Sequence, residues 1–391
     1  MTTTFPGYRR PDGQVGVRNH ILVIPTAICS SRTAEAIAEG LPAVVIPHEH
    51  GCHFDSRANE NLERLLIRLG RSPNVAAALV VSLGCESASM ERITAGIAES
   101  GKPVEGLRIQ EVGGTIRTIT RGREIVERFA RDTAALKPEP CGAEELILAV
   151  ECGGSDAFSG LSANPAVGAA VDLLIDDGGT VIFSETGEMV GAEHLLARRA
   201  VDEETRRRLL HIVGRAEGGF RNIEAHSGGV YIAVGNLAGG LTTIEEKSLG
   251  CIHKGGTRPL VEVIGYTDRP TRRGLVIMDS TGHDVASVIG KVAGGAQVVC
   301  FTTGRGTPTG CPIAPVIKVC SNSDTSRHMA DNVDVDAGTI LTGEESIAQV
   351  GRRIYEVVMA VAAGERTKTE ILGHREFAVA SRAPIPEGVG R

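Results

Sequence analysis

Short runs of aliphatic and β-branched residues alternate with longer amphipathic stretches along the first third of the chain. The runs are as long as strands, and the stretches between them carry apolar residues at spacings of three and four, as helices do. This alternation predicts βαβ units and a parallel sheet. The expected strands span residues 20–24, 43–46, 77–83 and 107–110, and the expected helices span 33–41, 59–69, 90–99 and 115–136.

The same alternation resumes after residue 145. Two prolines and a glycine within residues 137–142 stop the preceding helix and indicate a domain boundary. We expect the helix nearest the C-terminus to pack across this second half. The expected strands span 146–150, 180–184, 274–278 and 297–301, and the expected helices span 165–175, 203–215, 284–292 and 344–363.

The sequence therefore predicts an α/β fold of two Rossmann-like domains with mostly parallel sheets, an N-terminal domain at 1–138 and a C-terminal domain at 143–391. Ligands bind at the carboxyl ends of strands in such sheets, so we expect the site there, between the domains. Residues 218–256 are rich in glycine and show little periodicity. Long irregular segments inside compact domains are usually functional, so we expect an active-site loop there.

Composition narrows the class of protein. The 391 residues include 49 Gly but no Trp, four Tyr and eight Phe, and the formal net charge of −7 argues against general binding of nucleic acids or acidic membranes. No apolar run is long enough to span a bilayer, and the N-terminus lacks the apolar segment of a secretory signal, so we expect a cytoplasmic protein. The nine cysteines form no C-x-x-C pair, which indicates thiols and excludes a zinc ribbon.

Groups able to bind a metal follow one predicted strand after another. His48 and Cys52 follow the second strand, Cys85 and Glu86 follow the third, and Cys152 follows the first strand of the second half. Imidazole, thiolate and carboxylate donors together suit Fe(II), Zn or Mn better than Mg. A single buried cysteine is more often a small apolar residue than a ligand, but the clustering favours a metal. Three cysteines from three strand ends could instead hold a 4Fe-4S cluster.

A second group of residues indicates an anionic ligand. Residues 153–156 precede a predicted helix and could bind an anion with their backbone N–H groups. They fit neither the G-x-G-x-x-G nor the Walker A pattern, so we expect a small carboxylate rather than a nucleotide. Lys247, Lys254 and Arg305 could neutralise it, although each has the alternative of a surface cation. The chain has no G-x-S-x-G turn after a strand and no H-E-x-x-H motif, which argues against hydrolysis.

Long motifs spread over residues 7 to 375 are more specific. They read GYRRPDGQVGVRN at 7–19, HEHGC at 48–52, LGCE at 83–86, ECGGSDAFSG at 151–160, SETGEMVGAEHLLARRAV at 184–201, GGLTTIEEKSLG at 239–250 and FTTGRGTPTGC at 301–311. Together they resemble the altronate dehydratase and galactarate dehydratase family. The resemblance implies a metal-dependent lyase, typically with iron or manganese, that removes water from a sugar acid to give a 2-keto-3-deoxy acid.

The resemblance also implies partners. Relatives carry a small β-rich, SAF-like domain, either fused or as a separate subunit. This chain begins directly at the motif of the large domain, so we expect the small piece to be a separate subunit within a homo- or hetero-oligomer.

A dehydration of this kind needs a base for the α proton, an acid for the departing hydroxyl and positive charge for the enolate. We expect Lys247 to be the base and Glu185 or Asp156 to be the acid. The residues expected to hold Fe2+ or Mn2+ are His48, Cys52, Cys85, Glu86 and Cys152, with Cys29 as a weaker candidate, and those expected to hold the substrate are Asn19, Ser155, Asn164, Lys254 and Arg305.

Two other functions stay open at this point. The large subunit of a (2R)-sulfolactate sulfo-lyase belongs to the same family, and such a protein would release sulfite and pyruvate after the same α-deprotonation. A subunit without activity that binds a small acid and regulates a partner is the other alternative. The number of strand ends that carry possible ligands argues against this last interpretation.

Overall fold

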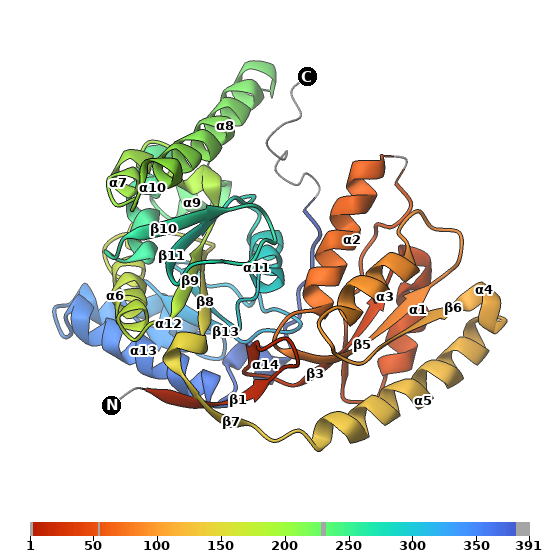
Figure 1. Ribbon diagram of the computed structural model, residues 1–391. Coiled ribbons are helices and arrows are strands. Elements are labelled where there is room, and N and C mark those ends of the chain that lie inside the picture. The colour runs from red at the N-terminus through yellow and green to blue at the C-terminus, as the bar shows by residue number, and fades with distance from the viewer. Residues whose placement is uncertain (1–2, 54, 228–231, 381–391) are drawn as a thin grey trace.

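A computed structural model describes residues 3–53, 55–227 and 232–380 of the chain, with only the backbone described for residues 223–227. Two parallel sheets, one of seven strands and one of four, dominate the structure, and a third sheet of three strands is antiparallel. Figure 1 shows the two parallel sheets side by side, the seven-stranded sheet on the left and the four-stranded sheet on the right. The expected α/β fold with mostly parallel sheets is confirmed.

The four-stranded sheet has the strand order β4-β3-β5-β6. Alternate residues of its central strands enter two different apolar cores: Leu22 and Ile24 pack towards α2 and α3, whereas Ile21 and Val23 pack towards α1 and α5. The strands are β3 (His20–Pro25), β4 (Ala43–Val45), β5 (Val75–Ser82) and β6 (Val104–Arg108), and the helices are α1 (Ile28–Ala38), α2 (Ser56–Gly70), α3 (Met90–Ala98), α4 (Ile109–Val112) and α5 (Thr115–Ala134).

The seven-stranded sheet has the strand order β10-β11-β9-β8-β12-β13-β14. The sequence pattern missed the edge strands β10 and β14 and also β13, which lies between β12 and β14. The strands are β8 (Ile147–Cys152), β9 (Thr180–Phe183), β10 (Leu260–Ile264), β11 (Gly274–Met278), β12 (Val298–Thr303), β13 (Val316–Cys320) and β14 (Val335–Asp336). The helices around it are α6 (Ala163–Asp176), α7 (Glu193–Ala197), α8 (Glu203–Ser227), α9 (Val234–Ala238), α10 (Ile244–Cys251), α11 (Asp284–Ala293), α12 (Ser323–His328), α13 (Ile347–Ala362) and α14 (Lys368–Leu372), with short 3-10 turns η1 (Ala143–Glu145), η2 (Thr186–Met189), η3 (Ile252–Gly255) and η4 (Gly338–Ile340).

The first strand of the chain does not join the four-stranded sheet. β1 (Thr4–Arg9) pairs with β2 (Val15–Gly16) and with β7 (Glu139–Gly142), which immediately precedes the seven-stranded sheet. Phe5 is 1% exposed and packs in the same core as side chains of β8 and α13. The start of the chain is therefore fixed to its second half, and the domain division at residues 138 and 143 stays a prediction.

One apolar core continues between the two parallel sheets. It includes Leu66 of α2 and Ile289 of α11. The buried side chain of Asn74 also links the two halves, because its amide donates to the carbonyl oxygens of Gln297 and Ile313, each at 2.9 Å. The two parallel sheets are therefore joined by buried apolar and polar contacts.

The prediction of a long loop at 218–256 is wrong for the residues that the structure describes, because most of them lie in helices. Helix α8 continues to Ser227, and α9, α10 and η3 follow within the segment. Glycine lowers helix propensity by only about 1 kcal/mol relative to alanine, so a glycine-rich sequence does not exclude helices. The predicted helix near the C-terminus is present as α13, and it packs on α6 and β1 as expected.

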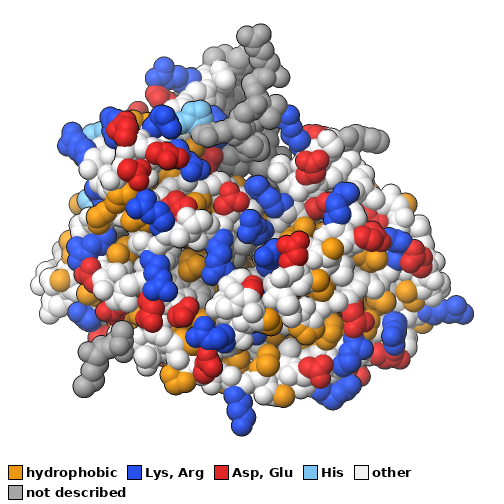
Figure 2. Space-filling view, in the orientation of Figure 1, with side chains coloured by type: hydrophobic (Ala, Val, Ile, Leu, Met, Phe, Trp, Pro, Cys, Tyr) orange, Lys and Arg blue, Asp and Glu red, His pale blue; other side chains and the backbone are white. Residues whose placement is uncertain are grey.

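Charged side chains of both signs are interspersed over the face of the molecule in Figure 2. None of the described helices combines the length and the apolarity that crossing a membrane requires.

Candidate active site

Four buried side chains converge beside the carboxyl ends of β8 and β9. The sulfur atoms of Cys152 and Cys251 and one carboxylate oxygen each of Glu185 and Glu188 all lie within 4.8 Å of one another. We call this group the Cys2Glu2 cluster. It lies at the kind of position where open parallel sheets bind ligands.

The two strands place Cys152 beside Glu185. Cys152 ends β8, the neighbouring strand β9 ends at Phe183, and Glu185 follows two residues later. Glu185 has a φ of 67°, in the left-handed region that non-glycine residues rarely adopt. Its N–H donates to the hydroxyl of Ser280 at 3.0 Å, which holds this turn in place. The turn then starts η2, which carries Glu188 into the same space.

Helix α10 supplies the remaining thiol and a lysine. Its first turn is capped by Thr243, whose hydroxyl accepts from the N–H of Glu246 at 3.2 Å. Lys247 and Cys251 are four residues apart and therefore lie on one face of the helix. The η3 turn follows directly and brings Lys254, which is fully buried.

Each carboxylate of the cluster offers one oxygen to a lysine and the other to the thiols. Oε1 of Glu188 pairs with Lys247, and its Oε2 accepts from the thiols of Cys152 at 2.9 Å and Cys251 at 3.0 Å. Oε2 of Glu185 lies 2.8 Å from Nζ of Lys254, and its Oε1 lies 3.8 Å from Sγ of Cys152. Two sulfur and two oxygen atoms therefore face one another, with the ammonium groups outside them.

This donor set fits a divalent metal ion. The two sulfur atoms are 3.8 Å apart, too far for a disulfide but close to the separation of about 3.8 Å that two thiolates have on a tetrahedral ion with metal–sulfur bonds of about 2.3 Å. A divalent ion in place of the two thiol protons would also leave the total charge of the buried group unchanged. Mixed sulfur and oxygen donors suit Fe(II) or Zn better than Mg, and thiolates are softer ligands than Mn(II) prefers.

Burial and neighbouring charges shift the pKa values of Glu185 and Glu188 in opposite directions. Burial raises the pKa of Glu185 well above its ordinary value, and the neighbouring Glu151 and Glu188 act in the same direction. Burial also acts to raise the pKa of Glu188, but Lys247 and Lys254 outweigh it and lower that pKa to about 2. Glu185 is thus the carboxyl group that favours the protonated form, and Glu188 is the carboxylate.

The pKa values of Lys247, Lys254 and Cys251 are also shifted by burial and by the neighbouring charges of the cluster. Burial acts to lower the pKa of Lys247, but Glu188 and Cys152 outweigh it, so the pKa lies above its usual value. The pKa of Lys254 is raised in the same way against burial. Burial, reinforced by Cys152, raises the pKa of the Cys251 thiol. Both lysines are therefore ammonium groups in this arrangement.

A further acidic group lies directly behind the cluster. One carboxylate oxygen each of Glu151, Glu185 and Asp284 lie within 4.8 Å of one another. Glu151 is fully buried, pairs with Lys291 through Oε2, and accepts there from the hydroxyl of Ser287 at 2.8 Å. This arrangement explains part of the raised pKa of Glu185, because two carboxyl groups this close do not readily ionise together.

A pocket of about 370 Å³ gives access to the cluster. Its volume lies within the range of small-molecule sites. The lining includes both thiols of the cluster and Lys247, and polar groups that could meet a hydroxy acid, namely Ser155, Asn164 and His253.

Several of the residues expected from the sequence lie in this site. Cys152, Glu185, Lys247 and Lys254 meet at the cluster. Lys254 holds Glu185 and has no exposed surface, so it orients that carboxyl group rather than reaching into the pocket.

Asn164 and Ser155 line the pocket, as expected, but part of their hydrogen-bonding capacity is already used. The amide of Asn164 accepts from Thr302 at 2.7 Å and donates to the carbonyl of Gly250 at 3.1 Å. The carbonyl of Ser155 accepts from the side chain of Asn236 at 3.1 Å.

Asp156 lines the pocket but does not have the surroundings expected of an acid. Its carboxylate accepts from the hydroxyls of Ser159 and Ser321 and from the amide of Asn322, at 2.8, 2.7 and 2.9 Å. These contacts tie the loops around Asp156 together, and its role as the acid stays a prediction.

Asn19 lies away from the cluster. It precedes β3, at the amino end of the four-stranded sheet, and its amide accepts from Arg10 at 2.8 Å and donates to the carbonyl of Thr133 at 2.9 Å. Arg305 follows β12, is exposed, and donates from Nη1 to the carbonyl of Gly235 at 2.8 Å.

The structure does not bring the other expected metal ligands to the cluster. Among the described residues, His48, Cys52, Cys85 and Glu86 belong to no group of three or more possible ligands whose atoms lie within 4.8 Å of one another. They lie at the carboxyl edge of the four-stranded sheet, where β4 and β5 end.

The side chains of His48 and Glu86 are already used there. His48 Nε2 lies 2.8 Å from the carbonyl of Pro25, and its Nδ1 accepts from the N–H of His50 at 3.2 Å. Glu86 accepts from the hydroxyl of Thr26 and from the N–H of Leu83 at 3.0 Å. These two residues hold their loops, and their expected role as ligands stays a prediction.

Sequence reasoning missed Glu188 and Cys251. A signal for Cys251 was present, because it follows Lys247 by four residues, a spacing that puts two residues on one face of a helix. The glycine-rich pattern of 218–256 predicts a loop and conceals this helix. Glu188 enters the site through a short 3-10 turn that follows the left-handed Glu185, and no periodicity in the sequence indicates that turn.

Comparison with known proteins gives consistent matches over nearly the whole chain. Residues 143–385 match the family model described as D-galactarate/Altronate dehydratase, C-terminal, and residues 7–134 match the one described as D-galactarate dehydratase/Altronate hydrolase, second domain. The chain is 39% identical to the (2R)-sulfolactate sulfo-lyase subunit beta of Chromohalobacter salexigens, over 96% of each chain.

Two sugar-acid enzymes are also similar. Galactarate dehydratase (L-threo-forming) of Escherichia coli is 35% identical over 98% of this chain and 77% of its own length. Altronate dehydratase of Bacillus subtilis is 32% identical over 96% of this chain and 77% of its own length.

Proposed function

Because the chain belongs to the D-galactarate/altronate dehydratase family, we propose that it is a lyase that eliminates the group β to the carboxylate of a small hydroxy acid. In its first form the proposal is dehydration of a sugar acid such as altronate or galactarate to a 2-keto-3-deoxy acid. The observation that carries it is the buried Cys2Glu2 cluster with two lysines beside a pocket for a small molecule.

Cys152, Cys251, Glu185 and Glu188 are the residues that would hold Fe2+, or Mn2+ as the less favoured ion. A cation bound there supplies positive charge for the enolate that forms when the α proton leaves. Lys247 lies against the same pocket, and its ammonium group is placed to hold the substrate carboxylate or to share the charge of the enolate.

Elimination of water needs a proton for the departing hydroxyl. Glu185 as the general acid stays a prediction, because burial raises its pKa, but binding of an ion by the same carboxyl group would require the ionised form. Lys254 orients this group through the 2.8 Å contact to Oε2. Lys247 as the base stays a prediction, because its pair with Glu188 keeps it protonated; it could accept the α proton only after losing its own.

A second form of the proposal is elimination of sulfite from (2R)-sulfolactate. The observation that favours it is the 39% identity to a sulfo-lyase subunit, with equal coverage of both chains. The α-deprotonation and the charge on the enolate are common to both reactions, and they differ in the leaving group. A small β-rich partner subunit is part of either form of the proposal.

The experiment is an anaerobic assay of the full chain, loaded with Fe2+, with altronate, galactarate or sulfolactate, each with and without a candidate small subunit. We expect a 2-keto-3-deoxy acid from one of the sugar acids. Sulfite with no keto-deoxy acid would overturn the first form and establish the second. Absence of both products from protein with a filled Cys2Glu2 cluster and its partner would overturn the lyase proposal itself.

A further inference from the structure

Exposed thiols gather at the carboxyl edge of the four-stranded sheet. All nine cysteines lie in the described part of the chain, and only Cys29, Cys52 and Cys85 are exposed. Cys29 follows β3 in the first turn of α1, Cys52 follows β4, and Cys85 follows β5. These strands are neighbours in the order β4-β3-β5, so their three carboxyl ends are adjacent.

Backbone hydrogen bonds hold the three loops against one another. The N–H of Ile28, next to Cys29, donates to the carbonyl of His50 at 3.1 Å. The carbonyl of Gly51, next to Cys52, accepts from the N–H groups of Ser87 and Ala88 at 2.9 and 3.1 Å. The loop after β4 thus lies between the other two and is bonded to both.

Gly51 makes this close stacking possible. Its φ of 116° is one that glycine adopts readily, and a Cβ there would lie 2.4 Å from the carbonyl oxygen of Thr26 and 2.6 Å from Ala27. Any larger residue would push the β4 loop away from the start of α1. The position is therefore built to bring two cysteine-bearing segments together.

The three thiols are exposed, whereas the other donors at this edge already make contacts. His48 and Glu86 are engaged by Pro25 and Thr26, and the rings of His50 and His53 lie 3.0 Å from each other. Cys29 is the second residue of α1, next to the start of that helix.

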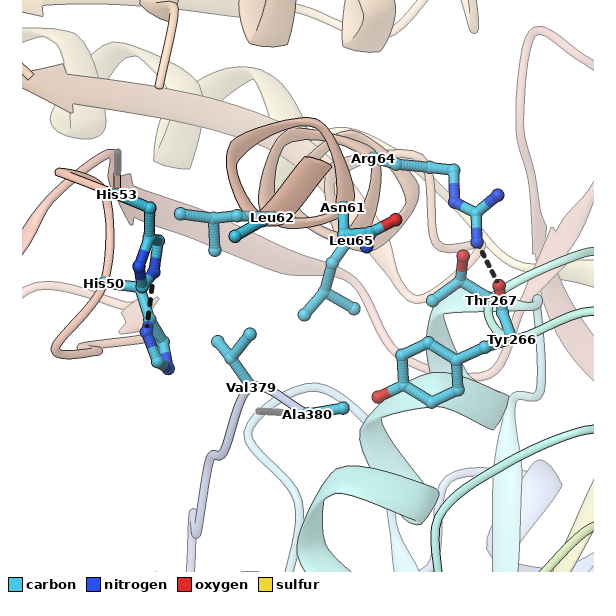
Figure 3. A pocket seen from close by; sticks show the side chains of 11 residues that line it. His50, His53, Asn61, Leu62, Arg64, Leu65, Tyr266, Thr267, Val379 and Ala380 are labelled. Atoms are coloured by element: carbon cyan, nitrogen blue, oxygen red, sulfur yellow. Dashed lines mark hydrogen bonds between the residues drawn. The ribbon is translucent and has the colours of Figure 1, made fainter. Parts of the chain in front are cut away.

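The separation of the three sulfur atoms argues against a single ion as the common ligand partner. Ligands of one tetrahedral ion lie close together, and the three sulfur atoms are not within 4.8 Å of one another. In a cubane each thiolate binds its own iron, so the sulfur atoms are farther apart. The loops at this edge also approach the rest of the molecule, because His50 and His53 on either side of Cys52 line a pocket that reaches Tyr266 beyond β10 (Figure 3).

We propose that Cys29, Cys52 and Cys85 hold a 4Fe-4S cluster through three of its irons, so that these thiols leave the fourth iron without a cysteine ligand. The cluster is separate from the Cys2Glu2 cluster, which has its own two thiols. It replaces the expectation that Cys152 would be part of such a set, because Cys152 faces Glu188 and Cys251 instead.

The test is anaerobic reconstitution of the full chain with ferrous iron and sulfide, followed by iron and acid-labile sulfide analysis and visible spectroscopy. We expect a brown protein with broad visible absorbance and equal amounts of iron and sulfide, after correction for the ion of the Cys2Glu2 cluster. Cys29→Ala, Cys52→Ala and Cys85→Ala should each lose most of the sulfide. Cys300→Ala, which removes a buried thiol of β12, is the matched control and should keep it.

A second readout tests the open iron. Mild oxidation with ferricyanide should convert the cluster to a 3Fe-4S form, in which one ferrous ion leaves and one electron passes to ferricyanide, with a new paramagnetic resonance signal. Sulfide retained in the variant without all three cysteines, or iron bound without sulfide in the parent protein, would overturn the proposal.

The two metal sites can be told apart. Cys152→Ala and Glu188→Gln should remove the mononuclear ion and leave the sulfide content unchanged. The parent protein could take up no sulfide and still bind an active metal ion at the Cys2Glu2 cluster. In that case the 4Fe-4S proposal fails and the proposed function stands.

Discussion

The carboxyl edges of the two parallel sheets carry the same kinds of side chain but use them differently. At the seven-stranded sheet, Cys152 and Glu188 are buried and point at each other, with the oxygen 2.9 Å from the sulfur. At the four-stranded sheet, Cys52 and Cys85 are exposed, and Glu86 is turned back onto its own loop. The loop geometry therefore decides which of the donor atoms at a strand end can bind the same ion.

Charge compensation separates the two edges further. Two lysines accompany the buried carboxylates of the Cys2Glu2 cluster, whereas Glu86 is satisfied by neutral donors. A buried ion pair costs desolvation energy and is rarely kept for stability alone. The comparison therefore favours the seven-stranded edge as the place where proton transfer occurs.

The largest expected effect is that of Glu188→Gln. It removes the carboxylate that faces both thiols and holds Lys247, so we expect loss of the bound ion and a decrease in activity of about 100-fold or more. Metal analysis and steady-state kinetics measure the two effects. Glu245→Gln, on the exposed side of α10, is the control; equal metal content in both variants would contradict the assignment.

Lys254→Met should come next, with a loss of about 3 kcal/mol in the free energy of unfolding, because a buried hydrogen-bonding group loses its partner. The substitution leaves Glu185 as a buried carboxyl group without its ammonium partner. Denaturant unfolding measures the loss. Arg258→Met, which breaks the exposed pair with Asp176, should cost about 1 kcal/mol or less, and a similar loss in both variants would refute the special role of the buried pair.

His48, at the edge of the four-stranded sheet, should make the stability of the protein depend on pH. Burial lowers the pKa of His48 to about 4, below the unfolded value of about 6.5, so the unfolded chain binds more protons between these pH values. Stability should fall as the pH drops from about 6.5 to 4, by up to about 3 kcal/mol from this residue. His48→Gln should flatten that slope, measured by unfolding at several pH values. His328→Gln removes an exposed histidine as the control.

Glu86→Gln should have the smallest effect, a loss of about 1–2 kcal/mol in the free energy of unfolding. The two carboxylate oxygens of Glu86 accept three hydrogen bonds, and the substitution replaces one of these oxygens with an amide nitrogen that cannot accept. The metal content of the Cys2Glu2 cluster should not change. Thermal unfolding together with metal analysis tests both statements. Loss of the mononuclear ion in this variant would mean that Glu86 is a ligand after all.

Much of the fold could be read from the sequence because strands and crossover helices have different periods. The strands expected at 20–24 and 274–278 are present as β3 and β11, and the helix expected at 90–99 is present as α3. The pattern failed where an element is short or contains glycine. β14 spans only Val335–Asp336, and α10 was hidden in a glycine-rich segment.

The candidate site was predicted only in part. Cys152 and Glu185 are strand-end residues, so sheet topology alone points to them. Cys251 and Lys247 arrive from a helix about 100 residues later in the chain than Cys152, and no local pattern relates the two segments. His48 was expected as a ligand because imidazole binds metals, but the carbonyl of Pro25 already occupies one of its ring nitrogens.

The sequence by itself determined the α/β class, the parallel sheets and the types of donor available, because these depend on residue type and on spacing along the chain. The tertiary structure decided which donors meet. It placed Glu188 between two thiols at 2.9 and 3.0 Å, and it left Cys29, Cys52 and Cys85 exposed on adjacent loops. The physical reason is that coordination and proton transfer depend on distances between atoms, and those are set by how loops from distant segments pack.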